Sequence, residues 1–289
     1  MTTYEQWDIV SSVGLTALAV AAGRAIDTQR RDRLVDDPYA AEFVRAAAPP
    51  VAMPTSPPES DDPEYQRVWG YLADRLAVRS RYFDQFFQRA AEAGVEQGVI
   101  LASGLDTRAF RLPWPEGFRL FEVDQPKVLE FKDEVLARES ATAACDRRCV
   151  RVDLRDDWEG ALDEAGFDRT RPTAWLAEGL LPYLPQDAEQ RLLETIHHLS
   201  APGSSIAVEI SSPSQRTNQW SPMMSKHLGV DMSSLMHSDD RPSPDTALAA
   251  LGWTTTVDTV VSMADHYRRN FDQQTRELSG QTGFVTAHL

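Results

Sequence analysis

The sequence predicts an α/β protein built on a mostly parallel β-sheet with helices on both faces. Two observations lead to this fold class. From residue 97 onwards, short apolar segments with strand character alternate with helical or loop segments, and amphipathic helical patterns fill the chain before residue 95. Such alternation indicates a parallel sheet, because parallel neighbours need a crossover connection that usually contains a helix.

The composition and net charge of the chain limit the kinds of molecule that it can bind. The 289 residues are 42% hydrophobic and carry a formal net charge of -15. A chain of this size can bury a large core, so we expect one elaborated domain or a domain with a cap. The acidic balance makes nucleic acid and anionic membranes electrostatically poor partners. Short basic groups at 30–33, 147–151 and 268–269 lack interleaved aromatic residues, and we interpret them as solvated surface.

The cysteines and the first residues bear on compartment. Cys145 and Cys149 have no histidines nearby, which leaves too few ligands for a structural zinc site, so we expect no metal and two reduced thiols. Residues 1–14 show no basic region followed by an apolar core, and no stretch is long enough to span a bilayer. We therefore expect a cytoplasmic protein without a membrane partner, either a monomer or a homodimer.

Residues 1–94 are predicted to form a helical extension in front of the sheet. A first helix is expected from Ser12 to about Arg31, and a second after Asp36-Asp37-Pro38, where an acidic residue can cap and proline can occupy the first turn. The proline-rich stretch from Ala48 to Pro63 predicts a loop. From Glu64 to Gly94, aromatic and aliphatic residues at helical spacing predict one long amphipathic helix or two abutting ones.

Residues 95–289 are predicted to form the sheet domain. Seven segments have strand character: Val99–Leu101, Leu120–Val123, Val150–Val152, Ala174–Ala177, Ser205–Ile210, Thr254–Val261 and Phe284–Ala287. A further helix is expected from Pro244 to Leu251. The segment at about 211–245 is rich in serine, proline, methionine and tryptophan, which favours an adaptable apolar lid inserted over a substrate.

Small or acidic residues follow four successive strand candidates. Ala102-Ser103-Gly104 come after the first, Asp124 after the second, Asp153-Leu154 after the third and Glu178 after the fourth. Ligands of open parallel sheets bind beyond the carboxyl ends of the strands. We therefore expect these residues to share one rim and to form a binding site.

The residues of this rim do not suit a phosphate. A dinucleotide-binding loop carries G-x-G-x-x-G so that the backbone can approach a pyrophosphate, whereas "ASGLDT" retains Gly104 alone. Asp124 follows Gly104 by 20 residues, the offset at which a carboxylate reaches ribose hydroxyls. Asp153 could accept from an adenine amino group, and Leu154 could pack on the ring. A cofactor with ribose and adenine but no phosphate fits best, and we predict S-adenosylmethionine rather than a nicotinamide dinucleotide.

Several motifs resemble a known family. The segments "WDIVSSVG", "VRSRYFDQFF", "VILASGLDTRAFRL", "FEVDQP", "RVDLRDDWEGAL" and "AEGLLPYLP" together resemble the actinobacterial S-adenosylmethionine-dependent methyltransferases related to leucine carboxyl methyltransferases. The resemblance runs from Trp7 to about Gln190 and reappears at "GFVTAHL". It implies a class I methyltransferase, Rossmann-like fold: a seven-stranded sheet whose last strand is antiparallel, an N-terminal helical extension and an inserted cap.

The resemblance also implies residue roles. By motif match, the cofactor contacts are Ala102, Ser103, Gly104, Asp124, Asp153 and Leu154, with Glu178 near the methionine moiety. In the relatives, basic side chains of the helical extension hold the methionine carboxylate. The matching candidates are Arg79, with Arg81 as its rival, and Arg24.

The first loop departs from the family's G-x-G, because Ala102 replaces the first glycine. We expect alanine to fit there with ordinary backbone dihedrals. Asp106, Thr107 and Arg108 are interpreted as a turn that anchors the loop, although Arg108 could instead face the carboxylate of the cofactor.

The chemistry favours an acidic acceptor. Methyl transfer from a sulfonium is an in-line displacement that depends on positioning a nucleophile, and a carboxylate is already ionised at neutral pH and needs no general base. No histidine lies beside a site motif. We expect an O-methyltransferase that acts on the carboxylate of a small-molecule or peptide-like acid in specialised metabolism, with Tyr183 as the candidate substrate contact.

Two alternatives stay open. A phenol or other hydroxyl acceptor would need a basic side chain, and His227, His237 or His266 could supply it. A protein that holds the cofactor without transferring methyl groups is the other alternative, since no catalytic signature is present.

Overall fold

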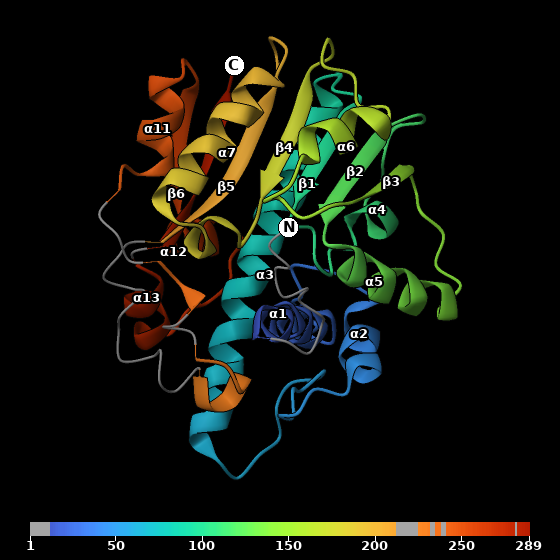
Figure 1. Ribbon diagram of the computed structural model, residues 1–289. Coiled ribbons are helices and arrows are strands. Elements are labelled where there is room, and N and C mark those ends of the chain that lie inside the picture. Colours follow the sequence, from blue (N-terminus) through green and yellow to red (C-terminus); the bar gives the residue numbers. More distant parts are fainter. Residues whose placement is uncertain (1–11, 212–224, 232–234, 238–240, 281) are drawn as a thin grey trace.

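A seven-stranded sheet forms the centre of the protein. The computed structural model describes residues 12–211, 225–231, 235–237, 241–280 and 282–289 (Figure 1). The sheet order is β3-β2-β1-β4-β5-β7-β6. β7 runs antiparallel to both of its neighbours, and the other described pairs are parallel. The strands are β1 Gln97–Leu101, β2 Arg119–Asp124, β3 Asp146–Arg151, β4 Thr173–Ala177, β5 Ser205–Ser211, β6 Thr254–Thr259 and β7 Thr282–His288. The predicted mostly parallel sheet with an antiparallel last strand is confirmed.

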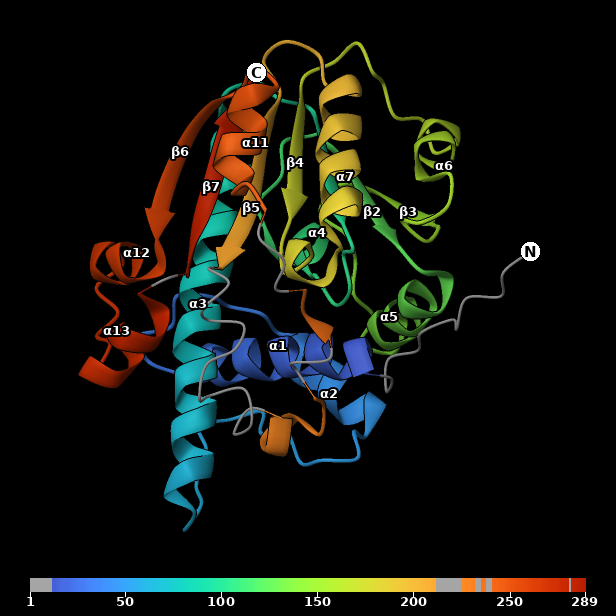
Figure 2. The ribbon, with the colours of Figure 1, turned by 60° about the vertical axis from the view of Figure 1, so that its left-hand side comes forward.

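Helices cover both faces of this sheet. The described helices are α1 Ser12–Thr28, α2 Ala40–Ala47, α3 Pro63–Glu92, α4 Arg108–Arg111, α5 Pro126–Arg138, α6 Trp158–Glu164, the 3-10 turn η1 Leu181–Tyr183, α7 Gln186–His198, α11 Pro244–Ala250, α12 Val260–His266 and α13 Gln273–Ser279. α6, α7 and α11 pack on one face. The second half of α3, with α4 and α12, packs on the other (Figures 1 and 2).

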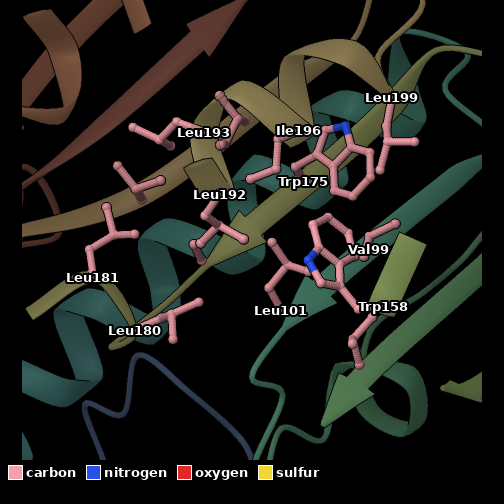
Figure 3. Close-up of a cluster of buried hydrophobic side chains, with 14 of the residues drawn as sticks. Val99, Leu101, Trp158, Trp175, Leu180, Leu181, Leu192, Leu193, Ile196 and Leu199 are labelled. Atoms are coloured by element: carbon pink, nitrogen blue, oxygen red, sulfur yellow. The ribbon is translucent and has the colours of Figure 1, made fainter. Parts of the chain in front are cut away.

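Residues of the central strands alternate between the two faces. Val99 and Leu101 of β1 pack with Trp158 and Trp175 in the cluster under α6 and α7 (Figure 3). Ile100, between them in sequence, packs with the aromatic side chains of α3 on the opposite face. A strand covered on both sides is mostly apolar on both faces, which explains why Val99, Ile100 and Leu101 of β1 form a continuous apolar run instead of an alternating one.

The predicted long amphipathic helix is a single element, α3. The Asp62 carboxylate caps it by accepting from the backbone N–H of Glu64 at 2.9 Å. Its first half packs Trp69 and Leu72 against α1 and α2, whereas its second half packs Phe83 against the sheet. α1 and α2 lie beyond the carboxyl ends of the parallel strands (Figures 1 and 2). Because α3 belongs to both parts, the domain division at residue 94 stays a prediction.

Two elements have boundaries that differ from the predicted ones, β6 at its end and α2 at its start. β6 ends at Thr259 and not at Val261, because Thr259 and Ser262 form a capping box: each side chain bonds the backbone N–H of the other, at 3.0 and 3.2 Å. α2 begins at Ala40 with no side-chain cap. Asp37 lies before the helix and does not cap its first turn: its carboxylate accepts from the Tyr39 N–H at 3.1 Å and from the side chains of Arg24 and Thr107.

The interpretation of the short basic groups as solvated surface is wrong for two arginines: Arg269 is buried, and the side chain of Arg147 is only 12% exposed. The Arg147 Nε donates to Glu122 of β2 at 2.8 Å. Nη2 of Arg269 donates to Asp27 at 2.6 Å, across 242 positions of sequence. Charged residues lie in the interior when they are paired, and no local pattern reveals a partner that distant.

The predicted lid at about 211–245 lies largely outside the described residues, as does the "WDIV" part of the first motif. Its described portion docks on the helical extension. Leu228 and Val230 are buried in the cluster formed with α1 and α3. Gly229 approaches Val51 of the proline-rich loop so closely that an added Cβ would lie 3.0 Å from a Val51 methyl group.

Close strand packing at Gly283 gives a stability test. A Cβ at this β7 position would lie 2.5 Å from the backbone oxygen of Asp258 in β6. Gly283→Ala should therefore lower the free energy of unfolding by about 1–3 kcal/mol, measured by urea unfolding. Gly70→Ala is the matched control, since no atom lies within 4 Å of its Cβ position in α3, and it should stabilise by about 0.5–1 kcal/mol. Equal effects would contradict the close approach.

Candidate functional site

The candidate site lies at the loops after β1 and β4. These two strands are neighbours at the switch point of the sheet, with β2 and β3 on one side of them and β5 on the other. Crevices at such switch points bind ligands in open α/β sheets. α1 lies across this edge (Figure 2). A Cβ placed on Gly104, in the loop after β1, would lie 3.8 Å from the Cβ of Ala17 in α1.

Ala102 adopts a left-handed backbone conformation, with φ of 49°, and Gly104 has φ of 47°. The expectation of ordinary dihedrals for Ala102 is therefore wrong. The loop doubles back onto β2, where the Ser103 N–H donates to the Val123 carbonyl at 3.1 Å. This anchoring imposes the left-handed conformation, which costs about 1–2 kcal/mol for alanine and which glycine would adopt without that cost.

Ser103 offers a polar atom to a ligand. Its side chain is buried, and its hydroxyl makes no hydrogen bond within the part of the chain that the structure describes. A buried hydroxyl without a partner is destabilising, so such a group indicates a ligand or water partner. An unsatisfied hydroxyl in this loop fits an adenosyl cofactor, because the uncharged portions of such a cofactor carry hydrogen-bonding groups.

Asp124 contacts the same loop. Oδ2 of Asp124 accepts from the Gly104 N–H at 2.6 Å, and Oδ1 accepts from the Gln125 N–H at 2.7 Å. Burial raises the pKa of this carboxyl to about 6, although the two backbone donors oppose the shift. The structure thus brings together the two residues that sequence spacing paired.

Asp153 and Leu154 follow β3 on the same rim. Nε and the backbone N–H of Arg155 donate to Asp153 Oδ1 at 2.8 and 2.9 Å. Although burial opposes it, this pairing holds the pKa of Asp153 below its usual value. Leu154 is half-buried against the sheet core. Asp153 is therefore an ionised acceptor already shared with an arginine.

Glu178 is clamped between two arginines. Nε of Arg79 lies 2.8 Å from Oε1 of Glu178, and Nη1 of Arg108 lies 2.8 Å from Oε2. Arg108 also pairs with Asp84 of α3 at 2.7 Å and with Asp106 of its own turn. Arg108 is fully buried by these three carboxylates, so the interpretation of its turn as an anchor is confirmed.

Sequence reasoning missed Glu209 and Arg75. Glu209 lies in β5, is buried, and pairs with Arg79 at 2.8 Å and with Arg75 of α3. These arginines hold the pKa of Glu209 below its usual value even though burial opposes them. The available signal was a lone carboxylate at the end of an otherwise apolar strand. Asp84, inside the aromatic run "RYFDQFF", carries the same signal.

Arg79, Arg81 and Arg24 occupy different places. Arg79 reaches Glu178, whereas Arg81 lies where its charge acts on Tyr267. Arg24 of α1 donates to Asp37 at 2.8 Å and to the Leu105 carbonyl at 2.7 Å. Arg24 thus ties the helical extension to the loop after β1.

Tyr183 lies in η1 beside the Arg79 and Glu209 pair. Its hydroxyl is hydrogen-bonded to Thr16 of α1, and burial raises its pKa, so the phenol stays protonated at neutral pH. His237 approaches this turn, where its backbone N–H donates to Pro182 at 2.9 Å. His227 and His266 lie elsewhere: the first contacts Glu64 at the start of α3 and the second is exposed on α12.

Neither a metal centre nor a membrane helix is found in the part of the chain that the structure describes. No group of histidine, cysteine, aspartate and glutamate side chains in these ranges is arranged to hold a metal ion. None of the described helices is both long and apolar enough to cross a bilayer. Cys145 and Cys149 are free thiols, and burial raises the pKa of Cys145 to about 12.

Comparison with known proteins identifies the family of this chain. The family model of leucine carboxyl methyltransferase matches residues 17–197. The chain belongs to this family. A Saccharopolyspora erythraea protein named as an S-adenosyl-L-methionine-dependent methyltransferase is 52% identical, with 99% of each chain covered. A Mycobacteroides abscessus protein of the same name is 44% identical, covering 99% of this chain and 95% of the other. The protein is an S-adenosylmethionine-dependent methyltransferase.

Solved structures confirm the class I methyltransferase fold. A DUF574 family protein from Streptomyces avermitilis aligns with a TM-score of 0.53 at 15% identity, covering 86% of this chain and 95% of the other. A protein from Thermobifida fusca described as a methyltransferase aligns with a TM-score of 0.51 at 18% identity, covering 93% of each chain. At such identities the likeness concerns the fold alone.

The strained loop of this family member gives a second stability test. Ala102→Gly should raise the free energy of unfolding by about 0.5–1 kcal/mol, because relief of the left-handed alanine exceeds the extra flexibility of glycine in the unfolded chain. Ala48→Gly should give a similar gain, since Ala48 has φ of 44°. Ala137→Gly within α5 should instead cost about 1 kcal/mol. A loss for Ala102→Gly in urea unfolding would contradict the strain.

Proposed function

We propose that this methyltransferase transfers the methyl group to a carboxylate oxygen of a small-molecule or peptide-like acid. The observation that carries the proposal is the state of the carboxylates around Tyr183. Glu178 is held by two arginines, and so is Glu209. The arginines hold the pKa of Glu209 below its usual value, which makes it a poor base, and the Tyr183 phenol keeps its proton. An acceptor that arrives already ionised suits such a site better than a hydroxyl that must lose a proton.

The cofactor residues are part of the same proposal. Asp124 would accept from the ribose hydroxyls, Ser103 would use its unpaired hydroxyl, and Leu154 with Asp153 would contact the adenine. Glu178 and Arg79 would bind the ammonium and carboxylate of the methionine moiety. When bound, S-adenosylmethionine supplies an electrophilic methyl group on a sulfonium.

The loop residues and Arg24 would support this site. Ala102 and Gly104 would let the backbone pass close to the cofactor, because both are left-handed. Arg24 would act by holding the loop, since its guanidinium already bonds Asp37 and Leu105. A hydroxyl acceptor is the second candidate, favoured by the position of His237 next to the turn that carries Tyr183.

The acceptor class can be tested directly. Purified protein with methyl-labelled S-adenosylmethionine is offered a panel of carboxylic acids and, as matched controls, phenols of the same carbon skeleton. We expect labelled product from the acids, and release of the label as methanol in mild base, because methyl esters hydrolyse there. Label that survives base, formed from the phenols, would instead establish a hydroxyl acceptor.

The Asp124 carboxyl predicts a pH dependence of cofactor binding. Its pKa of about 6 means that the carboxylate, the stronger acceptor for ribose hydroxyls, is present above pH 6 and lost below it. The affinity for S-adenosylhomocysteine, measured by calorimetry, should fall by up to about tenfold per pH unit below pH 6.

Two variants separate this effect from general acid damage. Asp124→Asn should bind more weakly at pH 7 and lose the dependence between pH 5 and 7. Asp153→Asn should keep the wild-type dependence, because the pKa of Asp153 is already lowered. An Asp124→Asn profile that follows the wild type would remove Asp124 from the cofactor site.

A further inference from the structure

Among the described residues, Arg75 has one carboxylate partner, Glu209, which it shares with Arg79. It lies one helical turn before Arg79 on α3, and both arginines bind Glu209, Arg75 at Oε1 and Arg79 at Oε2. Arg79 also has Glu178, and Arg108 has Asp84 and Asp106 in addition to Glu178. The positive charge is therefore least compensated at the Arg75 end of these ion pairs.

Exposure increases toward the same end. The side chain of Arg108 is 2% exposed, that of Arg79 is 8% exposed and that of Arg75 is 18% exposed. Nε of Arg75 makes no hydrogen bond with any residue in the described ranges. Of these three side chains, Arg75 is therefore the most exposed, and its Nε is a buried donor that still lacks a partner among the described residues.

Arg75 also lies on the acceptor side of the site. Its charge acts on the Tyr183 phenol, together with those of Arg79 and Glu209. Tyr183 follows Glu178 in the loop after β4, and Thr16 of α1 covers it. An anion held by Arg75 would therefore lie beside the residues proposed for the methionine moiety, where the methyl group is delivered.

We propose that Arg75 binds the carboxylate of the methyl acceptor. This inference rests on the proposed function and assigns the residue that recognises the acid. The guanidinium donates to one carboxylate oxygen and leaves the other free to react. That oxygen forms a bond to the methyl carbon as the carbon–sulfur bond breaks. The bonding electron pair stays on sulfur, and no proton moves.

The loss of charge in the reaction makes Arg75 bind the acid more tightly than the ester. The acid enters as an anion and leaves as a neutral methyl ester, so it loses its charge-assisted bond to Arg75 once it has reacted. After release of the ester, Glu209 is again the carboxylate that compensates the charge of Arg75, as in the structure described. Arg75 thus favours the substrate over the product.

The experiment compares Arg75→Gln, Arg75→Lys and the control Arg30→Gln with the wild type. Arg30 has a side chain 27% exposed and pairs with Asp74, the neighbour of Arg75 in α3. Calorimetry measures S-adenosylhomocysteine binding and, on the loaded protein, binding of the acid that the wild type methylates fastest. Initial rates give the KM for that acid. Glu209 keeps Arg79 in the variants, and thermal unfolding checks that they fold.

We expect Arg75→Gln to raise both the Kd and the KM for the acid by about 10- to 100-fold, the effect of losing one hydrogen bond to a charged group. Its affinity for S-adenosylhomocysteine should stay within about twofold of wild type, Arg75→Lys should be intermediate and Arg30→Gln unchanged. A wild-type KM in Arg75→Gln overturns this inference and leaves the proposed function standing. Weakened S-adenosylhomocysteine binding overturns it by assigning Arg75 to the cofactor. Base-stable products alone overturn both.

Discussion

The functional edge of this protein is held together by ion pairs that four arginines make with carboxylates: Arg75, Arg79, Arg108 and Arg111. They join four segments far apart in the chain: α3, the turn after β1, the end of β4 and the end of β5. Removing one member of such a pair leaves an uncompensated buried charge, at a cost of about 3–5 kcal/mol. The loops are therefore positioned together against one helix, α3.

The same contacts determine the chemistry of the rim. Glu209 and Asp84 each bind two arginines, which keep their pKa values low against the effect of burial. Asp124 has two backbone donors and contacts no arginine within the described ranges, and burial raises its pKa to about 6. The site thus contains carboxylates that stay ionised and have lost their basicity, beside one that titrates near neutrality. This division favours binding and orienting an ionised acceptor over abstracting a proton from it.

Much of the fold was predictable because it depends on short-range pattern. The apolar run of β1 and the helical spacing of α3 are visible in the sequence, and topology alone brings Gly104, Asp124 and Glu178 to one edge. The failures have long-range causes. Arg269 is buried and Arg147 is half-buried because each pairs with a carboxylate far away in sequence, and Glu209 was taken as part of an apolar strand. Ala102 is left-handed because a tertiary hydrogen bond to β2 imposes it.

The sequence by itself determined the sheet, the order of its elements, the family and the kind of cofactor, because these depend on periodicity and on motifs within a few residues. Only the tertiary structure decided which charges face each other: that Arg108 is an anchor, that Arg79 and not Arg81 reaches Glu178, and that Arg75 has a donor to offer. Ion pairs join atoms within 4 Å regardless of their separation along the chain, so their pairing appears only once the chain is folded.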